Sequence, residues 1–409
     1  MSARLIKSGA SDPTVLKQRT VILACVLWGD KFRRDFLAYC LPSLLAPGNL
    51  PALSAFGSVR FLIAAPRDDY AALAASPVFE TASRFAAFER LALPKAAAFK
   101  GPTGKMRRMS AGHRLAVSEM FTAGAYGTFI YPDTVFANGA MRRLVAAAGA
   151  GDEAVLALCP RFANERFLAA LESQRGEDAA APIALDARTL FRLALPAMHS
   201  ETRRYDVVAP FFADRPVMIY QAAADGAALI FHSTNWTPLL LDYARLEEHD
   251  AATLEDWTID GDYIWRNWPN PESVRLLGST DEAGMVSFTR EADVSYLPLR
   301  RECILSMPGL ANLYRRLVLR RFLHSDEIDP LKREQFLVPI EVRLADGDPV
   351  ALAVARRHVG RLAESVKDGP LTHTERRLLT LLIVINEGII RHFQYWLCHR
   401  KKRVKCPHP

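Results

Sequence analysis

The first third of the chain alternates short apolar runs with segments whose apolar residues recur at helical spacing. Val21 to Trp28 is continuously apolar, as expected for a strand buried on both faces, and Asp30 opens a helical pattern that extends to about Leu41. Further strands are predicted at 59–64, 86–91, in the run before Asp133 and at 154–159, with helices from Asp68, over 106–123 and from Met141. This rhythm predicts an α/β fold with a mostly parallel, doubly wound sheet.

The pattern changes twice farther along the chain. After about Arg161 the alternation weakens, and we expect helices near 162–173 and 186–195 and a strand from Ala227 to His232. From about Pro298 the pattern is helical, over 310–323, 349–366 and 374–397. The expected organisation is an N-terminal arm (1–19), an α/β domain (20–297) and a C-terminal helical extension (298–409). One early stretch, Pro42 to Pro51, holds three prolines, a glycine and an asparagine, which is typical of a loop.

The net charge of +7 is concentrated at one end of the chain. Residues 391–409 hold six basic side chains and no acid, so the rest of the chain is nearly neutral. A nucleic-acid-binding body would carry a basic face throughout, and we expect no nucleic-acid partner. The tail follows the apolar and aromatic stretch 393–397, a combination that can bind anionic lipid; a solvated tail is the alternative.

Cysteine usage and hydropathy indicate a cytoplasmic protein. The six cysteines form no C-x-x-C pair, which argues against a zinc framework and a disulfide scaffold and favours a reducing compartment. No apolar run reaches the length of a membrane span, and Met1 to Thr20 has no apolar signal segment. We therefore expect a cytoplasmic protein that contacts the inner membrane, if at all, through its tail.

The most informative motif is residues 127–136, Gly-Thr-Phe-Ile-Tyr-Pro-Asp-Thr-Val-Phe. A β-prone run delivers one carboxylate, Asp133, to its carboxyl end, which is the edge where open α/β sheets bind ligands. The alternative is that Asp133 caps a turn or the following helix. Common phosphate-binding signatures do not fit, because Gly101 to Lys105 lacks the first glycine and the final hydroxyl of a P-loop.

Two later features add candidate side chains. A predicted strand delivers His232 to its carboxyl end; the alternative is a structural histidine. Asp260 and Asp262 flank a glycine, so they can converge on one hard cation if the segment is a loop. They can equally cap a helix that starts near Tyr263.

This order of elements resembles the nucleotide-sugar-dependent glycosyltransferases of the GT-A fold, in an uncharacterised bacterial branch. In that superfamily an Asp-x-Asp motif holds a divalent cation, usually Mn²⁺ or Mg²⁺, that bridges the diphosphate of the donor. Asp133 aligns with the second aspartate, while Tyr131 replaces the first. One carboxylate is a poor anchor for such a cation. The departure leaves open a metal held partly by other groups and a metal-independent enzyme.

The resemblance also implies roles for other residues. Phe231 to Pro238 is similar to a later motif with a metal-ligating histidine, so His232 joins Asp133 as a metal ligand. Donor binding is assigned to Asp133, Trp28, Lys105 and Arg107, because the basic pair leads into the long helix at 106–123, whose N-terminus favours anions. The alternative for the basic pair is a helix start on the surface.

Asp260 and Asp262 are the candidates for the base that deprotonates the acceptor hydroxyl. The hypothesis is a glycosyltransferase that moves a sugar from a nucleotide-diphosphate donor, most simply a UDP-sugar, to a surface glycan or glycolipid precursor. Two alternatives remain: a non-catalytic binding or scaffold protein on a GT-A-like frame, and a nucleotidyltransferase.

Overall fold

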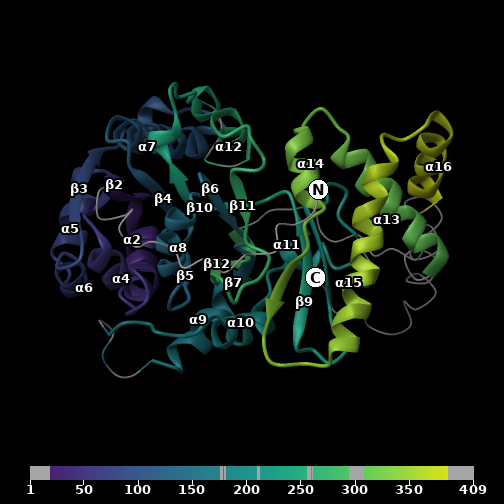
Figure 1. The fold of residues 1–409 in the computed structure, drawn as a ribbon, viewed down its shortest axis with the longest axis horizontal. Helices are drawn as coiled ribbons and strands as arrows, with labels where there is room; N and C mark the ends of the chain where they lie inside the picture. The colour runs from purple at the N-terminus through teal and green to yellow at the C-terminus, as the bar shows by residue number, and fades with distance from the viewer. Residues whose placement is uncertain are drawn as a thin grey trace, which may run out of the picture.

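The computed structural model of the protein describes residues 19–175, 178, 181–209, 212–255, 259, 261–293 and 308–385. It has two lobes side by side (Figure 1). One lobe is built on a seven-stranded sheet, and the other on a three-stranded sheet covered by long helices. Asp260 and the basic tail lie outside the described residues.

The seven-stranded sheet confirms the predicted α/β class. Its strand order is β11-β6-β10-β4-β1-β2-β3. The strands are β1 (Val21–Val26), β2 (Val59–Ala65), β3 (Ala87–Ala92), β4 (Tyr126–Ile130), β6 (Ala154–Ala157), β10 (Thr237–Asp242) and β11 (Val274–Leu276). All neighbours are parallel except β10, which runs antiparallel to both β4 and β6.

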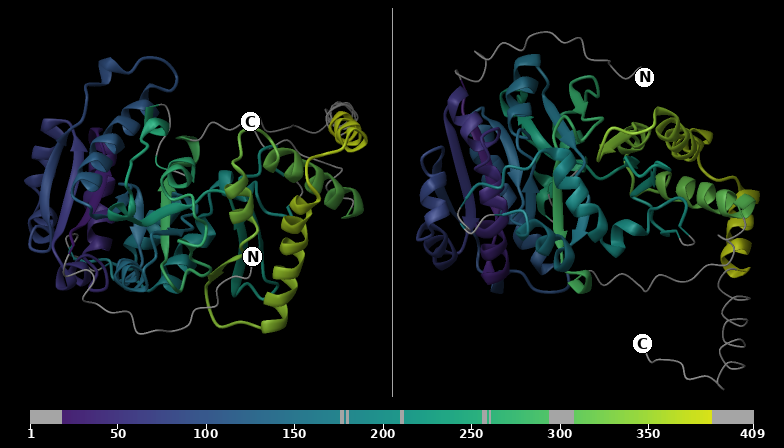
Figure 2. Two further views of the ribbon diagram at one scale, coloured as in Figure 1. Left: turned by 45° about the horizontal axis from the view of Figure 1, so that its top comes forward. Right: turned by 90° about the horizontal axis from the view of Figure 1, so that it is seen from below.

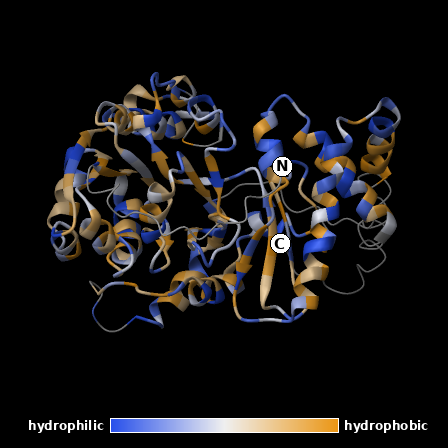
Figure 3. Cartoon of the chain, in the orientation of Figure 1, coloured by the Kyte–Doolittle hydropathy of each residue, from blue (hydrophilic) through white to orange (hydrophobic). Residues whose placement is uncertain are grey.

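Helices cover both faces of this sheet, which explains why its central strands are apolar throughout. Every residue of β1 is buried, and alternate side chains enter different cores: Ile22 faces one core, and Leu23 the other. One face is covered by α7 (Gly104–Thr122), which packs through Ala116 and Met120. The opposite face is covered by α2 (Gly29–Asp35), the π-helix η1 (Phe36–Cys40), α3 (Leu41–Leu44), α4 (Leu50–Phe56), α5 (Arg67–Ala74), α6 (Pro77–Ala82) and α8 (Arg142–Ala150). Figure 3 shows hydrophobic and hydrophilic residues alternating along these helices.

The prediction of a loop from Pro42 to Pro51 is largely wrong. Helix α3 ends at Leu44 and α4 begins at Leu50, so only five residues between them are outside a helix. Pro42 and Pro51 lie in the first turns of these two helices. Proline is tolerated there because a first-turn N–H has no helical partner to lose. The composition therefore marks helix starts here, and not an open loop.

Directly after β4 the chain enters a small sheet, whose strand order is β5-β12-β7. It consists of β5 (Thr134–Phe136), β7 (Arg161–Ala163) and β12 (Met285–Thr289). Near it lie α9 (Asn164–Glu172), α10 (Ala187–Ala194) and α11 (Ser200–Arg203). Pairing of β5 with β12 fixes the turn that carries Asp133, whose carbonyl accepts a hydrogen bond from the Phe288 N–H at 2.9 Å.

The second lobe is built on the sheet β13-β9-β8, made of β8 (Met218–Ala222), β9 (Ala228–Ser233) and β13 (Ile340–Arg343). Around it lie α13 (Pro308–Leu323), α14 (Pro330–Phe336), α15 (Pro349–Glu364) and α16 (His373–Val384). Helix α12 (Gly261–Asn267) belongs to the lobe of the large sheet. Strand β13 corrects the prediction that the chain beyond 298 is helical throughout. It has only four residues, too few to show an alternating pattern between two helical segments.

The lobes share one core. A single cluster of buried side chains includes Phe129 of the large sheet, Phe288 of the small sheet, and Phe231 and Ile340 of the second lobe. Figure 2 shows the two lobes from two further directions. Within the described part of the chain, no helix combines the length and apolar character needed to cross a membrane.

Candidate functional site

The connections of the large sheet reverse direction at β1. The chain leaves β1 for β2 and β3 on one side, then returns to add β4 on the other. Strands β1 and β4 are parallel and paired from Val21↔Tyr126 to Cys25↔Ile130, so their carboxyl ends meet at one edge. Open α/β sheets bind ligands in the crevice beyond such a switch point. Trp28 follows β1 and Asp133 follows β4, which places both at this edge.

Asp133 is half-buried in the turn between β4 and β5. Burial raises the pKa of its carboxyl, while Arg161 and Lys31 act in the opposite direction. The alternative that Asp133 caps the next helix does not hold, because α8 begins at Arg142 and its N-cap is Met141. The carboxylate therefore does not cap that helix, while a hydrogen bond with its own backbone N–H also lowers its pKa, as the turn alternative allows.

A second carboxylate, Asp35, lies near Asp133, and sequence reasoning missed it. It is the last residue of α2, next to the π-helix η1. Burial raises the pKa of its carboxyl, and Asp133 raises it further, whereas Lys31 lowers it. Its Oδ2 is buried without a hydrogen-bond partner. The signal that could have found it is spacing: Lys31 and Asp35 are four residues apart on the helix that directly follows β1.

Basic side chains from three elements surround these two acids. The Lys31 Nζ lies 3.9 Å from Asp35 Oδ2 and 3.7 Å from Asp293 Oδ2. Arg34 and Arg290 lower the pKa of Asp35, and Arg161 lowers that of Asp133, although burial is the larger effect on both acids. We call Lys31, Arg34, Arg161 and Arg290 the cationic rim. The last three are exposed, and Arg161 also pairs with Glu201 at 2.6 Å.

The predicted donor-binding residues are only partly brought together. Trp28 is half-buried, and the Arg108 guanidinium lies 4.8 Å from the centre of its ring. Arg108 itself is buried on α7 and donates to the Pro94 carbonyl at 3.0 Å. Lys105 and Arg107 are exposed on the first turns of α7, as in the surface alternative. Of the basic residues at this helix start, it is Arg108 that reaches Trp28.

His232 lies elsewhere. It is on β9, in the sheet of the second lobe, whereas Asp133 follows β4 of the large sheet. Its Nδ1 is 2.8 Å from the Phe336 carbonyl oxygen, and burial lowers its pKa to about 4. Its Nε2 is buried without a hydrogen-bond partner. These contacts do not bring His232 to Asp133, and they suit the structural alternative, in which a neutral histidine ties β9 to α14.

Asp262 also lies away from the carboxyl edge of β1 and β4. It is in the first turn of α12, and its Oδ1 is 2.9 Å from Lys332 Nζ on α14. A carboxylate in a first turn interacts favourably with the helix dipole. Its partner in the prediction, Asp260, is not among the described residues. Trp236 and Trp265 are buried in the main core.

The Mn²⁺ or Mg²⁺ implied by the resemblance fits the surroundings of Asp133 poorly. Tyr131 supplies no carboxylate, and the contacts of His232 are with α14. Among the described residues there is no group of three or more His, Cys, Asp or Glu side chains that could hold a metal. The second carboxylate at this edge, Asp35, already has a basic neighbour, because the Lys31 Nζ lies 3.9 Å from its Oδ2.

Three thiols line the protein interior beside Asp133. Burial raises the pKa of Cys25, Cys40 and Cys159, and the charge of Asp133 adds to the effect in each case. Cys40 also donates from its Sγ to the Tyr131 carbonyl at 3.4 Å. At neutral pH these side chains are uncharged thiols, so they act as small packing groups and not as nucleophiles.

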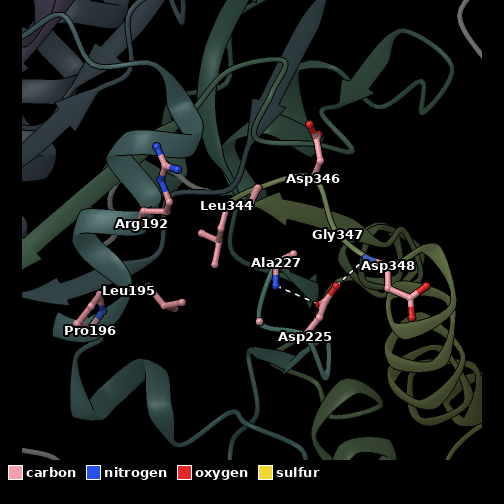
Figure 4. Close-up of a pocket in the computed structure, with 11 residues that line it drawn as sticks. Arg192, Leu195, Pro196, Asp225, Ala227, Leu344, Asp346, Gly347 and Asp348 are labelled. Carbon is pink, nitrogen blue, oxygen red and sulfur yellow. Dashed lines mark hydrogen bonds between the residues drawn. The ribbon is translucent and has the colours of Figure 1, made fainter.

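A hollow of about 560 Å³ lies in the second lobe, between the end of α10 and two loops near β9 and β13 (Figure 4). Its acidic side chains are used to hold the loops. Asp225 accepts hydrogen bonds from the N–H groups of Ala227 and Asp348, and Asp346 pairs with Arg188. Asp348 caps α15. We assign no ligand to this hollow, because its polar groups have structural partners.

Comparison of the chain with models of known protein families finds no match, and a search of curated proteins finds none. The argument for function therefore rests on the site at the carboxyl ends of β1 and β4.

Proposed function

We propose that the protein is a glycosyltransferase on a GT-A-like frame, which moves a sugar from a nucleotide-diphosphate donor to a surface glycan or glycolipid precursor. The observation that carries the proposal is the position of Asp133 beyond the switch point between β1 and β4, with Asp35 and the cationic rim around it. A mostly parallel sheet with one reversed strand is compatible with that frame.

The side chains at this edge suit a nucleoside diphosphate. Departure of the diphosphate leaves negative charge, which exposed arginines and a lysine can stabilise. Trp28, backed by Arg108, offers an aromatic face at the end of β1 for a nucleotide base or sugar. Asp133 is placed to accept hydrogen bonds from donor hydroxyl groups. The acceptor base predicted at Asp260 remains a prediction.

The decisive variant is Asp133→Asn, which keeps the shape of the side chain and removes its charge. We expect transfer from, or hydrolysis of, a UDP-sugar to fall by about 100-fold or more, since the carboxylate contacts the donor. The assay is release of nucleoside diphosphate across a panel of UDP-, GDP- and dTDP-sugars. Asp346→Asn, at an exposed position in the second lobe, is the matched control and should keep wild-type activity.

Wild-type turnover in folded Asp133→Asn would contradict the proposal. Tyr131 in place of the first aspartate favours the scaffold alternative. Calorimetry with a panel of nucleotide sugars distinguishes the scaffold from the enzyme. Binding of no nucleotide sugar by the wild-type protein would favour the scaffold. Release of pyrophosphate from a nucleoside triphosphate would instead identify a nucleotidyltransferase.

A further inference from the structure

We propose that the connection between β3 and α7, together with the start of that helix, binds the surface of an anionic membrane. We call this segment, residues 93–105, the lysine loop, because it carries Lys95, Lys100 and Lys105. The membrane contact does not rest on the proposed function. Its consequence for the reaction, that an acceptor held in the membrane is presented to the candidate site, does rest on it.

The lysine loop borders the candidate site. Strands β4, β1, β2 and β3 are parallel neighbours, so their carboxyl ends share one edge of the sheet. The loop leaves β3 at this edge, about 10 Å from the end of β1, since two strand spacings separate them. Arg108 connects the two places: it donates to the Pro94 carbonyl at 3.0 Å, and its guanidinium lies 4.8 Å from the centre of the Trp28 ring. A surface bound to the loop would therefore lie beside the ligand-binding edge.

The charge of the lysine loop is not compensated by acids. The chain has seven lysines and arginines between Glu89 and Glu119, and no aspartate or glutamate. The three lysines of the loop are exposed, and none of them forms an ion pair within the part of the chain that the structure describes. Each of the other described lysines has an acid partner: Lys31, Lys332 and Lys367. Unpaired lysines gathered in one exposed segment suit a partner with many negative charges.

An apolar turn within the loop favours a membrane over other polyanions. Between Lys95 and Lys100 lies the 3₁₀ turn η2 (Ala96–Ala98), whose three alanines are all exposed, followed by the half-buried Phe99. Apolar groups flanked by lysines suit the boundary between lipid headgroups and acyl chains, where the ammonium groups meet phosphate and the apolar groups leave water. A nucleic acid or a soluble polyphosphate would leave these alanines in water.

The loop is folded by its own backbone. The Ala98 N–H donates to the Lys95 carbonyl, and the Phe99 N–H donates to the Ala96 carbonyl, both at 3.0 Å. At Gly104 a Cβ atom would lie 2.5 Å from the Phe99 carbonyl oxygen, so only glycine lets the start of α7 approach the loop this closely. A segment that is already ordered loses less conformational entropy on binding, which favours its use as a contact surface.

The experiment is sedimentation of the full chain with vesicles of phosphatidylcholine, with and without phosphatidylglycerol. We expect binding to the anionic vesicles that weakens as salt is added. Lys95→Gln/Lys100→Gln should lower the apparent affinity by about 10-fold or more, because each lysine near an anionic surface adds to the attraction. Arg215→Gln/Lys367→Gln removes two exposed charges from the second lobe and should bind as wild-type protein does.

Hydrogen–deuterium exchange locates the contact, because the tail at 391–409 is also basic. We expect the amides of residues 94–104 in wild-type protein to exchange more slowly when anionic vesicles are present. Protection confined to the tail would overturn the proposal, and so would equal vesicle affinity of Lys95→Gln/Lys100→Gln and its control. Wild-type protein that binds both kinds of vesicle equally, or neither, would also overturn it. Protection of the loop by single-stranded RNA, and not by vesicles, would assign it to nucleic acid instead.

Vesicle binding and turnover are independent readouts. A protein that binds anionic vesicles through the loop but turns over no nucleotide sugar would retain the membrane contact and lose the proposed function. Turnover of nucleotide sugars by wild-type protein whose loop is not protected by vesicles would do the reverse.

Discussion

Asn49 fixes the segment that follows Asp133. It is fully buried, and its Nδ2 donates to the carbonyls of Ser43 and Ala137 at 2.8 and 3.0 Å. Its Oδ1 accepts from the N–H groups of Gly139 and Met141. One amide thus joins the turn before α4 to the chain between β5 and α8.

We expect Asn49→Ala to lower the free energy of unfolding by about 2 to 4 kcal/mol, because several buried backbone groups lose their partner at once. Urea unfolding followed by circular dichroism measures the loss. Asn312→Ala, at an exposed position of α13, should change stability by no more than about 0.5 kcal/mol. Equal stability of both variants would show that Asn49 contributes no more than a surface residue.

At this scale the sequence located Asp133 but not its neighbours. An apolar run that ends in an acid predicts a ligand-edge carboxylate from local pattern alone. Asp35 joins it across 98 positions, and only the pairing of β1 with β4 brings the two together. His232 has the same local signal as Asp133, a polar residue late in a strand, yet it belongs to another sheet. Local pattern cannot tell these cases apart.

Among the elements, those with the longest pattern were predicted best. The apolar runs of β1 and β2 and the long periodic segment of α7 were located to within a few residues. The helices α3 and α4 and the strand β13 were missed because they are short, and because proline marks a first helical turn as readily as a loop. Short elements of this kind depend on tertiary contacts.

Helix α16 offers a test at the scale of one element. Thr372 and Glu375 form a capping box, and Arg320 of α13 also binds Glu375. Arg320 and the Thr372 N–H lower the pKa of Glu375 to about 2, below its ordinary value of 4.5. The charged carboxylate therefore stabilises the folded state above about pH 4.5, and this contribution is lost as pH falls toward 2.

We expect wild-type protein to melt at a higher temperature than Glu375→Gln at about pH 6, and the difference to shrink by about pH 3. Differential scanning fluorimetry across this range measures it. Glu364→Gln removes an exposed partner of Lys367 and should show no such trend. A difference that grows on acidification would contradict the assignment.

For the whole molecule, the core argues for joint folding of the two lobes. Strand β13 pairs with β9 from Ile340↔Phe231 to Arg343↔Ala228, and Val342 lies in the cluster that reaches Phe129. Helix α15 packs on the other side of β9 through Ala355 and Ile230. The expected boundary at residue 297 therefore falls between strands of one sheet.

A chain that ends at residue 297 should lose cooperative unfolding and bind a hydrophobic dye, because β9 loses its partner strand and its helix. A chain that ends at residue 385 keeps every described element and should unfold in one calorimetric transition, like the full chain. Two separate transitions in the full chain, or a cooperatively folded 1–297 fragment, would show that the lobes are independent.

The π-helix η1 has a consequence for insertions and deletions in this chain. Its i→i+5 pattern accommodates one residue more than an α-helical turn. Removing one residue from this turn would restore an ordinary helix and rotate the preceding segment by about 100° relative to α3. Lys31 and Asp35 lie in that preceding segment, while α3 is fixed through the hydrogen bond between Ser43 and Phe136. A related chain with a one-residue deletion in this turn would keep Asp133 in place, but its equivalents of Lys31 and Asp35 would be rotated away from it.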